Sequence, residues 1–296
     1  MQTTRFLNLT CIELRNEALS LLISQSAGPR VISLRLHHGP NLLAELPDLT
    51  ALCPGSGLFH FYGGHRLWIA PEYPPLTCLP DDDPVEITEI EHGLLAVQPP
   101  AGGVQKTLRV TLPPGAARVI VEHTLTNRGD APLTCAAWAI TQLAPGGTAI
   151  LPHSTGDADP FGVLPNRQIN LWPYADVNDP HMQWGNAYTL VRAAFTGGRF
   201  KMGFPNPRGW LAYWQAGTLF VKRAVFDPQA AYLDFGSSSE CYCDPRFLEL
   251  ETLSGVRMLP AGESLSHVEG WEIYGEVAPP VDESAAGRIA DQLGLG

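Results

Sequence analysis

The sequence predicts an all-β fold, a large and mostly antiparallel sandwich or barrel, and two observations carry this prediction. Short runs with strand-like alternation recur between turn signals, and 29 glycines and 27 prolines among 296 residues exceed the usual share. Patterns of helical period are nearly absent. With 45% hydrophobic residues, a chain of this length can bury one large core. We therefore expect one β domain over residues 1–278 and a tail, 279–296, that forms a short helix.

Each predicted strand is an apolar or alternating run, and the clearest are residues 18–24, 30–36, 93–98, 106–112 and 118–126. The turn at Pro113-Pro-Gly115 separates the last two, which predicts an antiparallel pair. Near the end of the chain, RFLELETLSGVRML and LSHVEGWEIYGEV flank the turn PAGES and are predicted to form a closing hairpin. The C-terminal helix is expected over residues 282–293, after two prolines. Residues 151–187 show no regular pattern, and an irregular segment of that length is usually functional.

Composition and charge exclude several classes of protein. A net charge of −11 with no basic cluster argues against binding to nucleic acid or to an anionic membrane. The chain has no apolar run of about 18 residues and no export signal at its start, so we expect a cytoplasmic protein. Six scattered cysteines are typical of free thiols rather than of a disulfide scaffold.

Metal and cofactor motifs are also missing from the sequence. Cys241-Tyr-Cys243 stands without a second pair, and no histidines have metal-binding helical spacing. The nucleophile elbow, the phosphate loop and the dinucleotide fingerprint are absent. We expect no metal and no cofactor.

The stretch GGHRLWIAPE, residues 63–72, brings His65, Arg66, Trp68 and Glu72 together at a glycine bend. Aromatic rings beside cations and carboxylates suit a sugar, which offers apolar faces for stacking and hydroxyl groups for hydrogen bonds. Trp68 is expected to serve as a core anchor. The candidate substrate-binding residues are Arg66, Glu72, Gln142, Trp172, Lys222 and Glu249.

In Leu248-Glu-Leu-Glu-Thr-Leu253 the two carboxylates lie two residues apart. Residues two apart on a strand share a face, so Glu249 and Glu251 point the same way. Two acidic side chains on one face form either a solvated surface or a catalytic wall. The residues alone leave both interpretations open.

Four segments resemble the aldose 1-epimerase-like, or galactose mutarotase-like, superfamily: GGHRLWIAPE, LPDDDPVE, the presumed hairpin of residues 119–147, and FLELETLSGVRMLPAGESLSHVEGWEIY. They lie within residues 57–275 and follow the family's order. The resemblance implies a galactose mutarotase-like β-supersandwich, mostly antiparallel, with a sugar site in a broad cleft on one sheet.

The resemblance also implies roles for individual residues. Leu250-Glu251-Thr252 matches the family motif that carries the general base, so this role falls to Glu251. The family places a catalytic histidine in a Thr-Asn-His segment, where this chain reads Trp138-Ala-Ile-Thr-Gln-Leu143. His65 or His153 would have to act as the acid instead.

Three functions remain open at this point. The first is an isomerase that interconverts sugar anomers by general acid–base catalysis. The second is a carbohydrate-binding protein that has kept the cleft without the chemistry. The third is a glycoside hydrolase or lyase that uses Glu249, Glu251 or Glu72 as an acid–base pair. The expected partner is a small sugar or an oligosaccharide, not nucleic acid or a membrane, and the oligomeric state is left open.

Overall fold

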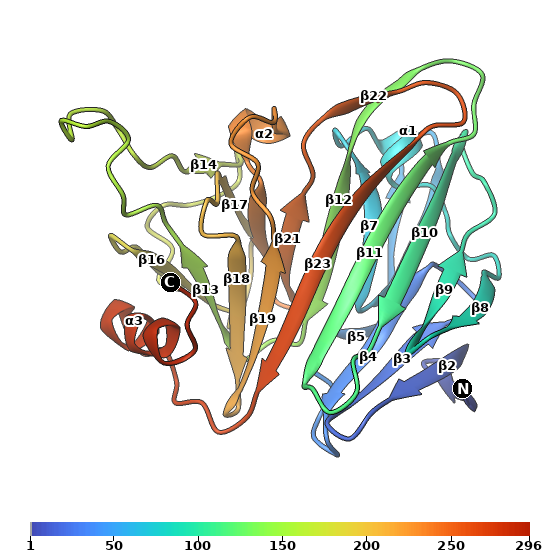
Figure 1. Cartoon of the computed structure of the whole chain (residues 1–296), viewed down its shortest axis with the longest axis horizontal. Coiled ribbons are helices and arrows are strands. Elements are labelled where there is room, and N and C mark those ends of the chain that lie inside the picture. The colour runs from blue at the N-terminus through green and yellow to red at the C-terminus, as the bar shows by residue number, and fades with distance from the viewer. Residues whose placement is uncertain (1) are drawn as a thin grey trace.

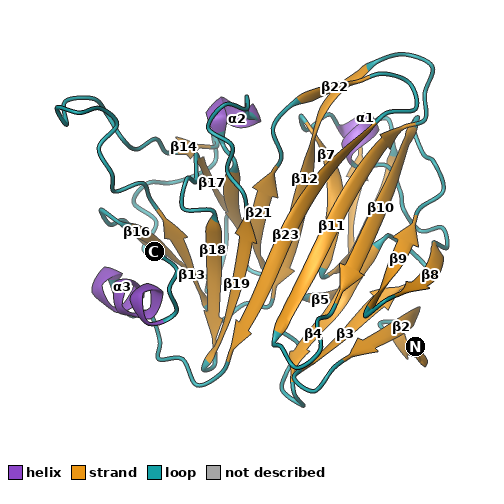
Figure 2. Ribbon diagram, viewed as in Figure 1, coloured by secondary structure: helices purple, strands orange, loops and turns teal. Residues whose placement is uncertain are grey.

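Two large antiparallel sheets lie face to face in the computed structural model, which describes residues 2–296 (Figure 1). One sheet has 11 strands and the other has 10, and a two-stranded ribbon lies beside them. The helical segments are few, short and peripheral (Figure 2). The predicted all-β, mostly antiparallel fold with a short C-terminal helix is confirmed.

The 11-stranded sheet runs in the order β1 (Gln2–Phe6), β2 (Leu9–Arg15), β3 (Leu19–Ser24), β4 (Arg30–Leu36), β7 (His65–Ala70), β12 (Leu133–Leu143), β21 (Leu248–Leu253), β20 (Ser239–Cys243), β17 (Phe200–Phe204) and β14 (Asn170–Leu171), with β22 (Arg257–Leu259) paired to β12.

The 10-stranded sheet runs in the order β15 (Met182–Gln183), β16 (Tyr188–Arg192), β13 (Thr148–Pro152), β18 (Trp210–Gln215), β19 (Thr218–Ala224), β23 (Ser264–Tyr274), β11 (Arg118–Asn127), β10 (Val104–Thr111), β9 (Gly93–Val97) and β8 (Glu86–Ile90). The ribbon consists of β5 (Glu45–Cys53) and β6 (Gly57–Gly63), and the helical segments are α1 (Pro74–Thr77), α2 (Leu233–Gly236) and α3 (Glu283–Gln292).

The predicted strands correspond to β3, β4, β9, β10 and β11, and β10 pairs with β11 as expected. The C-terminal helix α3 starts after Asp282, whose side chain caps it by accepting a hydrogen bond from the Ala285 N–H at 2.7 Å. No helix among residues 2–296 has both the length and the apolar character to cross a membrane.

The two predicted hairpins are wrong. Strand β21 pairs with β12 and β20 in one sheet, while β23 pairs with β11 and β19 in the other. Strands β11 and β12, which follow one another in the sequence, likewise belong to opposite sheets. In each case the turn carries the chain across the sandwich, because both strands have an apolar face that must meet the opposite sheet.

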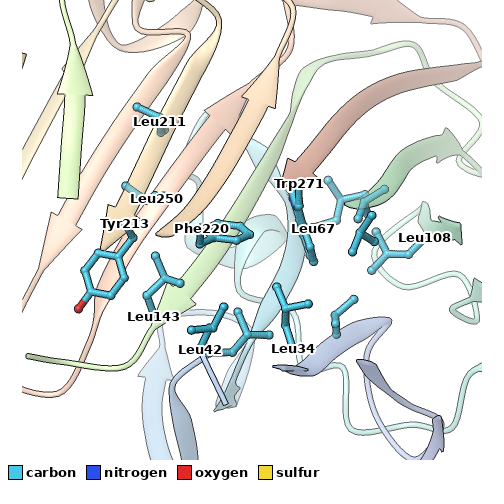
Figure 3. Close-up of a cluster of buried hydrophobic side chains, with 14 of the residues drawn as sticks. Leu34, Leu42, Leu67, Leu108, Leu143, Leu211, Tyr213, Phe220, Leu250 and Trp271 are labelled. Carbon is cyan, nitrogen blue, oxygen red and sulfur yellow. The ribbon is translucent and has the colours of Figure 1, made fainter. Parts of the chain in front are cut away.

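The core fills the space between the two sheets (Figure 3). Leu67 and Leu250 come from the 11-stranded sheet, and Leu108, Phe220 and Trp271 come from the other. All of these residues are at most 2% exposed. Strand alternation places these apolar side chains on the inner faces, so the intervening residues point away from the core.

A buried ion pair lies within this core. The Lys222 ammonium on β19 is 2.9 Å from a carboxylate oxygen of Glu269 on β23, and both side chains are fully buried. Lys222 also donates to the carbonyls of Ala139 and Leu250, at 2.9 Å each. Because these carbonyls belong to β12 and β21, the ion pair ties the two sheets together.

Three histidines continue this polar network. The His123 ring donates through Nδ1 to the His267 carbonyl at 2.9 Å, so its Nε2 accepts from Nε2 of His65 at 2.7 Å. His65 Nδ1 then accepts from Thr141, 2.9 Å away. Burial lowers the pKa of all three histidines, that of His267 to about 3, so the rings are neutral. The network is therefore a satisfied structural element.

We predict that Lys222→Met destabilises the protein by about 3–5 kcal/mol, because it leaves the Glu269 carboxylate buried without its cation. Urea denaturation measures the free energy of unfolding. Arg109→Met, at an exposed position on β10, is the control and should change stability by about 0.5 kcal/mol or less. The double variant Lys222→Met/Glu269→Leu should cost less than the sum of its two single changes, and strict additivity would contradict the role given to this pair.

Candidate functional site

The outer face of the 11-stranded sheet carries a pocket of about 340 Å³ that is lined by both charged and apolar side chains. One wall is built by neighbouring strands β7, β12, β21, β20 and β17, of which β21 is seen between β19 and β23 in Figure 1. Residues of the β5–β6 ribbon, among them Leu52 and Phe61, also line the pocket. Along each strand, side chains point alternately into the core and toward the outer face. The outward residues that line the pocket include Arg66, Trp138, Glu249, Tyr242 and Lys201.

The glycine bend before β7 lets this strand take its place in the wall. Gly63 and Gly64 have φ values of +90° and +74°. A Cβ atom on Gly63 would lie 1.9 Å from the Ala44 carbonyl oxygen, and one on Gly64 would lie 2.2 Å from that of Val31. Only glycine permits both the backbone conformation and this close approach. The bend thereby fixes which face of the sheet receives Arg66.

Arg66 and Glu249 form an ion pair across β12. The Arg66 Nη2 atom donates to Oε1 of Glu249 at 3.0 Å, and the Arg66 guanidinium lies over the Trp68 ring, 4.3 Å from its centre. Strand β7 pairs with β12 without a bulge, so Trp68 shares the face of Arg66 and lines the pocket. Trp68 also packs within a satellite apolar cluster, which gives it part of the expected anchoring role.

Glu249 is the pocket carboxyl group that titrates near neutrality. It is 7% exposed, and burial raises its pKa to about 7, although Arg66 opposes the shift. Glu249 therefore populates both protonation states at neutral pH. A carboxyl group with this property can both accept and donate a proton.

Glu251 shares the outward face with Glu249, as predicted, but it lies deeper. Its Oε2 atom accepts from the Trp138 indole N–H at 2.6 Å and from the Lys201 ammonium at 3.1 Å. Lys201 is also 2.7 Å from Oε2 of Glu240. Burial alone would lower the pKa of Lys201, but Glu251 and Glu240 raise it above its usual range. Glu251 is fully buried and its charge is compensated by this network.

The other sequence-predicted residues divide between the pocket and other parts of the molecule. Glu72 lines the pocket, and Trp172 covers the Lys201 ammonium at 4.7 Å from its ring centre. Gln142 faces outward on β12 but is fully buried, and neither polar atom of its side chain has a partner among residues 2–296.

His65 and Lys222 lie on the inner face of the sandwich, in the core network, because alternation along β7 sends His65 to the side opposite Arg66. His153 lines a separate pocket of about 350 Å³ and is hydrogen-bonded to Thr189 at 2.7 Å. Burial lowers the pKa of His153. The structure therefore does not bring His65, His153 or Lys222 together with Glu249.

Several pocket residues were not predicted, namely Tyr242, Arg199, Lys201 and Arg246, and neither was Glu240, the partner of Lys201. The run Phe200-Lys-Met-Gly-Phe204 held a usable signal, because its alternation places Lys201 opposite three apolar side chains. The positions of Arg199, Tyr242 and Arg246 depend on the pairing of β17 with β20 and of β20 with β21, which no local pattern contains.

Within residues 2–296, the one group of three potential metal-ligating side chains whose ligand atoms converge within 4.8 Å is His65, His123 and Glu269. All of these atoms already have partners in the core network. The Lys222 ammonium is a cation next to Glu269. Hydrogen bonds and Lys222 therefore satisfy this group as it stands.

Two face-to-face antiparallel sheets with a polar site on the outer face of one sheet define a galactose mutarotase-like fold. The structure is similar to a galactose mutarotase-like protein from Lactobacillus casei, with a TM-score of 0.56 and 10% identity over 89% of this chain and 100% of that one. It is also similar to a galactose mutarotase-like protein from Clostridium acetobutylicum, with a TM-score of 0.57 and 11% identity over 93% and 98%.

A galactose mutarotase related enzyme from Lactobacillus acidophilus gives a TM-score of 0.52 and 8% identity, over 91% of this chain and 99% of that one. No family model and no curated protein matches the sequence. At these identities the similarity establishes the fold.

The raised pKa of Glu249 predicts a pH-dependent stability. Between about pH 4.5 and pH 7 the folded protein holds a proton that the unfolded chain releases, so stability falls as the pH rises through this window. We expect the free energy of unfolding of the wild type to decline relative to that of Glu249→Gln from pH 4.5 to 7 and to level off above pH 7. Urea denaturation at several pH values tests this.

The exposed Glu263→Gln variant is the matched control and should show no such pH-dependent difference. A difference between wild type and Glu249→Gln that stays constant with pH would mean that Glu249 titrates in its ordinary range, and a change in the opposite sense would mean that folding lowers its pKa; either result contradicts the prediction.

Proposed function

We propose that this protein binds a sugar in the pocket on the 11-stranded sheet and interconverts its anomers, with Glu249 as the acid–base group. The observation that carries the proposal is the position of Glu249, a carboxyl group of pKa about 7 that lines a pocket together with aromatic rings. Trp68, Trp138 and Tyr174 supply those rings. The galactose mutarotase-like fold supports a carbohydrate ligand.

In the proposed reaction, Glu249 removes the proton from the anomeric hydroxyl group as the bond between the anomeric carbon and the ring oxygen breaks. The bonding electrons pass to the ring oxygen, and the anomeric carbon becomes an aldehyde. An alkoxide is a stronger base than an amine, so the Lys201 ammonium can supply the proton that the ring oxygen takes. Rotation of the aldehyde and closure from its other face give the second anomer, and the two protons return.

The residues around the pocket support these roles. Arg66 holds the Glu249 carboxylate, and the Lys201 ammonium lines the pocket in its protonated form. Glu251, which the family resemblance marks as the base, accepts hydrogen bonds from Trp138 and Lys201 and acts here through the position of Lys201. Glu249 is the better base because it faces the pocket.

A second candidate function is carbohydrate binding without turnover. The observation in its favour is that no histidine lines this pocket within the described part of the chain, residues 2–296. An imidazole has a pKa well suited to protonating the ring oxygen, whereas an ammonium of raised pKa gives up its proton slowly. Calorimetry together with exchange NMR separates the two functions. Binding without turnover predicts heat of sugar binding in calorimetry but no acceleration of anomer exchange in NMR.

We predict that the wild type accelerates anomer exchange of at least one free aldose, and that Glu249→Gln lowers this acceleration by about 10²–10⁴-fold through loss of the base. Exchange NMR on a panel of aldoses measures the rate. The rate should rise with pH through about pH 7, where Glu249 becomes a carboxylate. Glu263→Gln, at an exposed turn, is the control and should match the wild type.

If the wild type accelerates no aldose, or if Glu249→Gln retains full activity while its circular dichroism matches that of the wild type, the proposed catalysis is wrong. Sugar binding without exchange would then favour the second candidate function.

A further inference from the structure

Four cationic side chains line the proposed sugar pocket of this acidic protein. Four of the 19 lysines and arginines line it, but only two of the 30 acidic residues, Glu72 and Glu249. The chain as a whole has a net charge of −11. Carboxylates can neutralise such cations, so the charge available to a ligand depends on which of the four is unpaired.

Two of these cations lie at the same end of the pocket. Arg199 directly precedes β17, and Arg246 lies in the turn between β20 and β21. Strands β17 and β20 pair so that Phe200 is opposite Cys243, which brings the start of β17 beside the end of β20. Both arginines line the pocket.

Arg199 differs from the other three cations because it has no hydrogen bond or ion pair with any of residues 2–296. Arg66 is paired with Glu249, Lys201 with Glu240 and Glu251, and Arg246 with Asp244. The guanidinium carbon of Arg199 lies 4.1 Å from the centre of the Tyr174 ring. Stacking occupies the face of a guanidinium group and leaves its N–H edges free to donate.

We propose that this end of the pocket binds the anionic group of an acidic sugar, with Arg199 as its principal donor. This inference rests on the proposed function, because it assigns a charge class to the ligand of the same pocket. A carboxylate and a phosphate each present a pair of oxygen atoms that a guanidinium group can bind through two hydrogen bonds.

The spacing along β17 suits such a ligand. Arg199 precedes Lys201 by two residues, which in extended backbone is about 6.6–6.8 Å. Residues two apart on extended backbone share a face, and both Arg199 and Lys201 line the pocket. A sugar whose anomeric carbon lies near Lys201 and Glu249 can therefore place an anionic substituent beside Arg199.

Two acidic residues, Asp244 beside Arg246 and Glu72 in the pocket lining, form no ion pair with Arg199. Asp244 is occupied by Arg246 and by the backbone N–H of Arg246. Glu72 lines the pocket and interacts with Arg199 electrostatically without forming an ion pair. Arg199 thus keeps its hydrogen-bonding capacity for a ligand.

Isothermal titration calorimetry at low salt tests the proposal on matched neutral and acidic sugars: the free hexose, the hexuronate and the hexose 6-phosphate of the gluco, galacto and manno series. We expect at least one acidic sugar to bind about tenfold or more tightly than the neutral sugar of its series. The preference should shrink in 1 M NaCl, which screens exposed charges. The tighter of the two acidic forms identifies the anionic group.

Arg199→Ala should bring the ratio of acidic to neutral affinity close to one, whereas Arg109→Ala, an exposed arginine of the other sheet, should leave the ratio as in the wild type. Equal affinity for neutral and acidic sugars, or an unchanged ratio in Arg199→Ala, overturns this inference and leaves the proposed function standing. Absence of binding to every sugar of the panel overturns both.

Discussion

The ion pair between Arg66 and Glu249 is the interaction on which the site depends. It joins β7 to β21 across β12. Burial by itself favours the neutral form of Glu249, and the Arg66 cation opposes this effect, so the pKa of Glu249 is about 7. Without the cation, Glu249 would be a buried neutral acid. With full exposure, it would be an ordinary carboxylate at neutral pH.

A second polar system lies on the inner side of these strands, between the two sheets, and the two systems serve different purposes. On the inner face, Lys222 and Glu269 are bound from several sides. On the outer face, Arg66 Nη1, Glu251 Oε1 and the Trp68 indole N–H lack partners within residues 2–296. Buried polar groups in folded proteins are normally hydrogen-bonded, so the inner system is a structural link and the outer one is suited to a polar ligand.

Local sequence patterns predicted the strands of this fold well, because apolar alternation between turns depends on neighbouring residues alone. They also placed Glu249 and Glu251 on one face, since residues two apart on a strand always share a side. The same rule separates His65 from Arg66, which were expected to act together at the glycine bend. A two-residue period allows adjacent side chains to share a site only where a bulge intervenes, and β7 has none.

What the sequence could not predict depends on long-range pairing. The contact of Lys201 with Glu251 spans 50 positions and that of Arg66 with Glu249 spans 183. To predict either contact, one must know the order of the strands in the sheet. The sequence does not give this order, because the segment after each strand could return to either sheet. The turns that carry β11 to β12 and β22 to β23 across the sandwich look like hairpin turns locally, so the opposite-sheet pairing had no local signal.

A crystal structure with a bound sugar tests the central claim most directly. The account predicts that the sugar occupies the pocket of the 11-stranded sheet, with its ring against Trp68 or Trp138 and an anomeric oxygen within hydrogen-bond distance of Glu249. A sugar bound instead at the separate pocket beside His153, with the Glu249 carboxyl group out of contact, would contradict it.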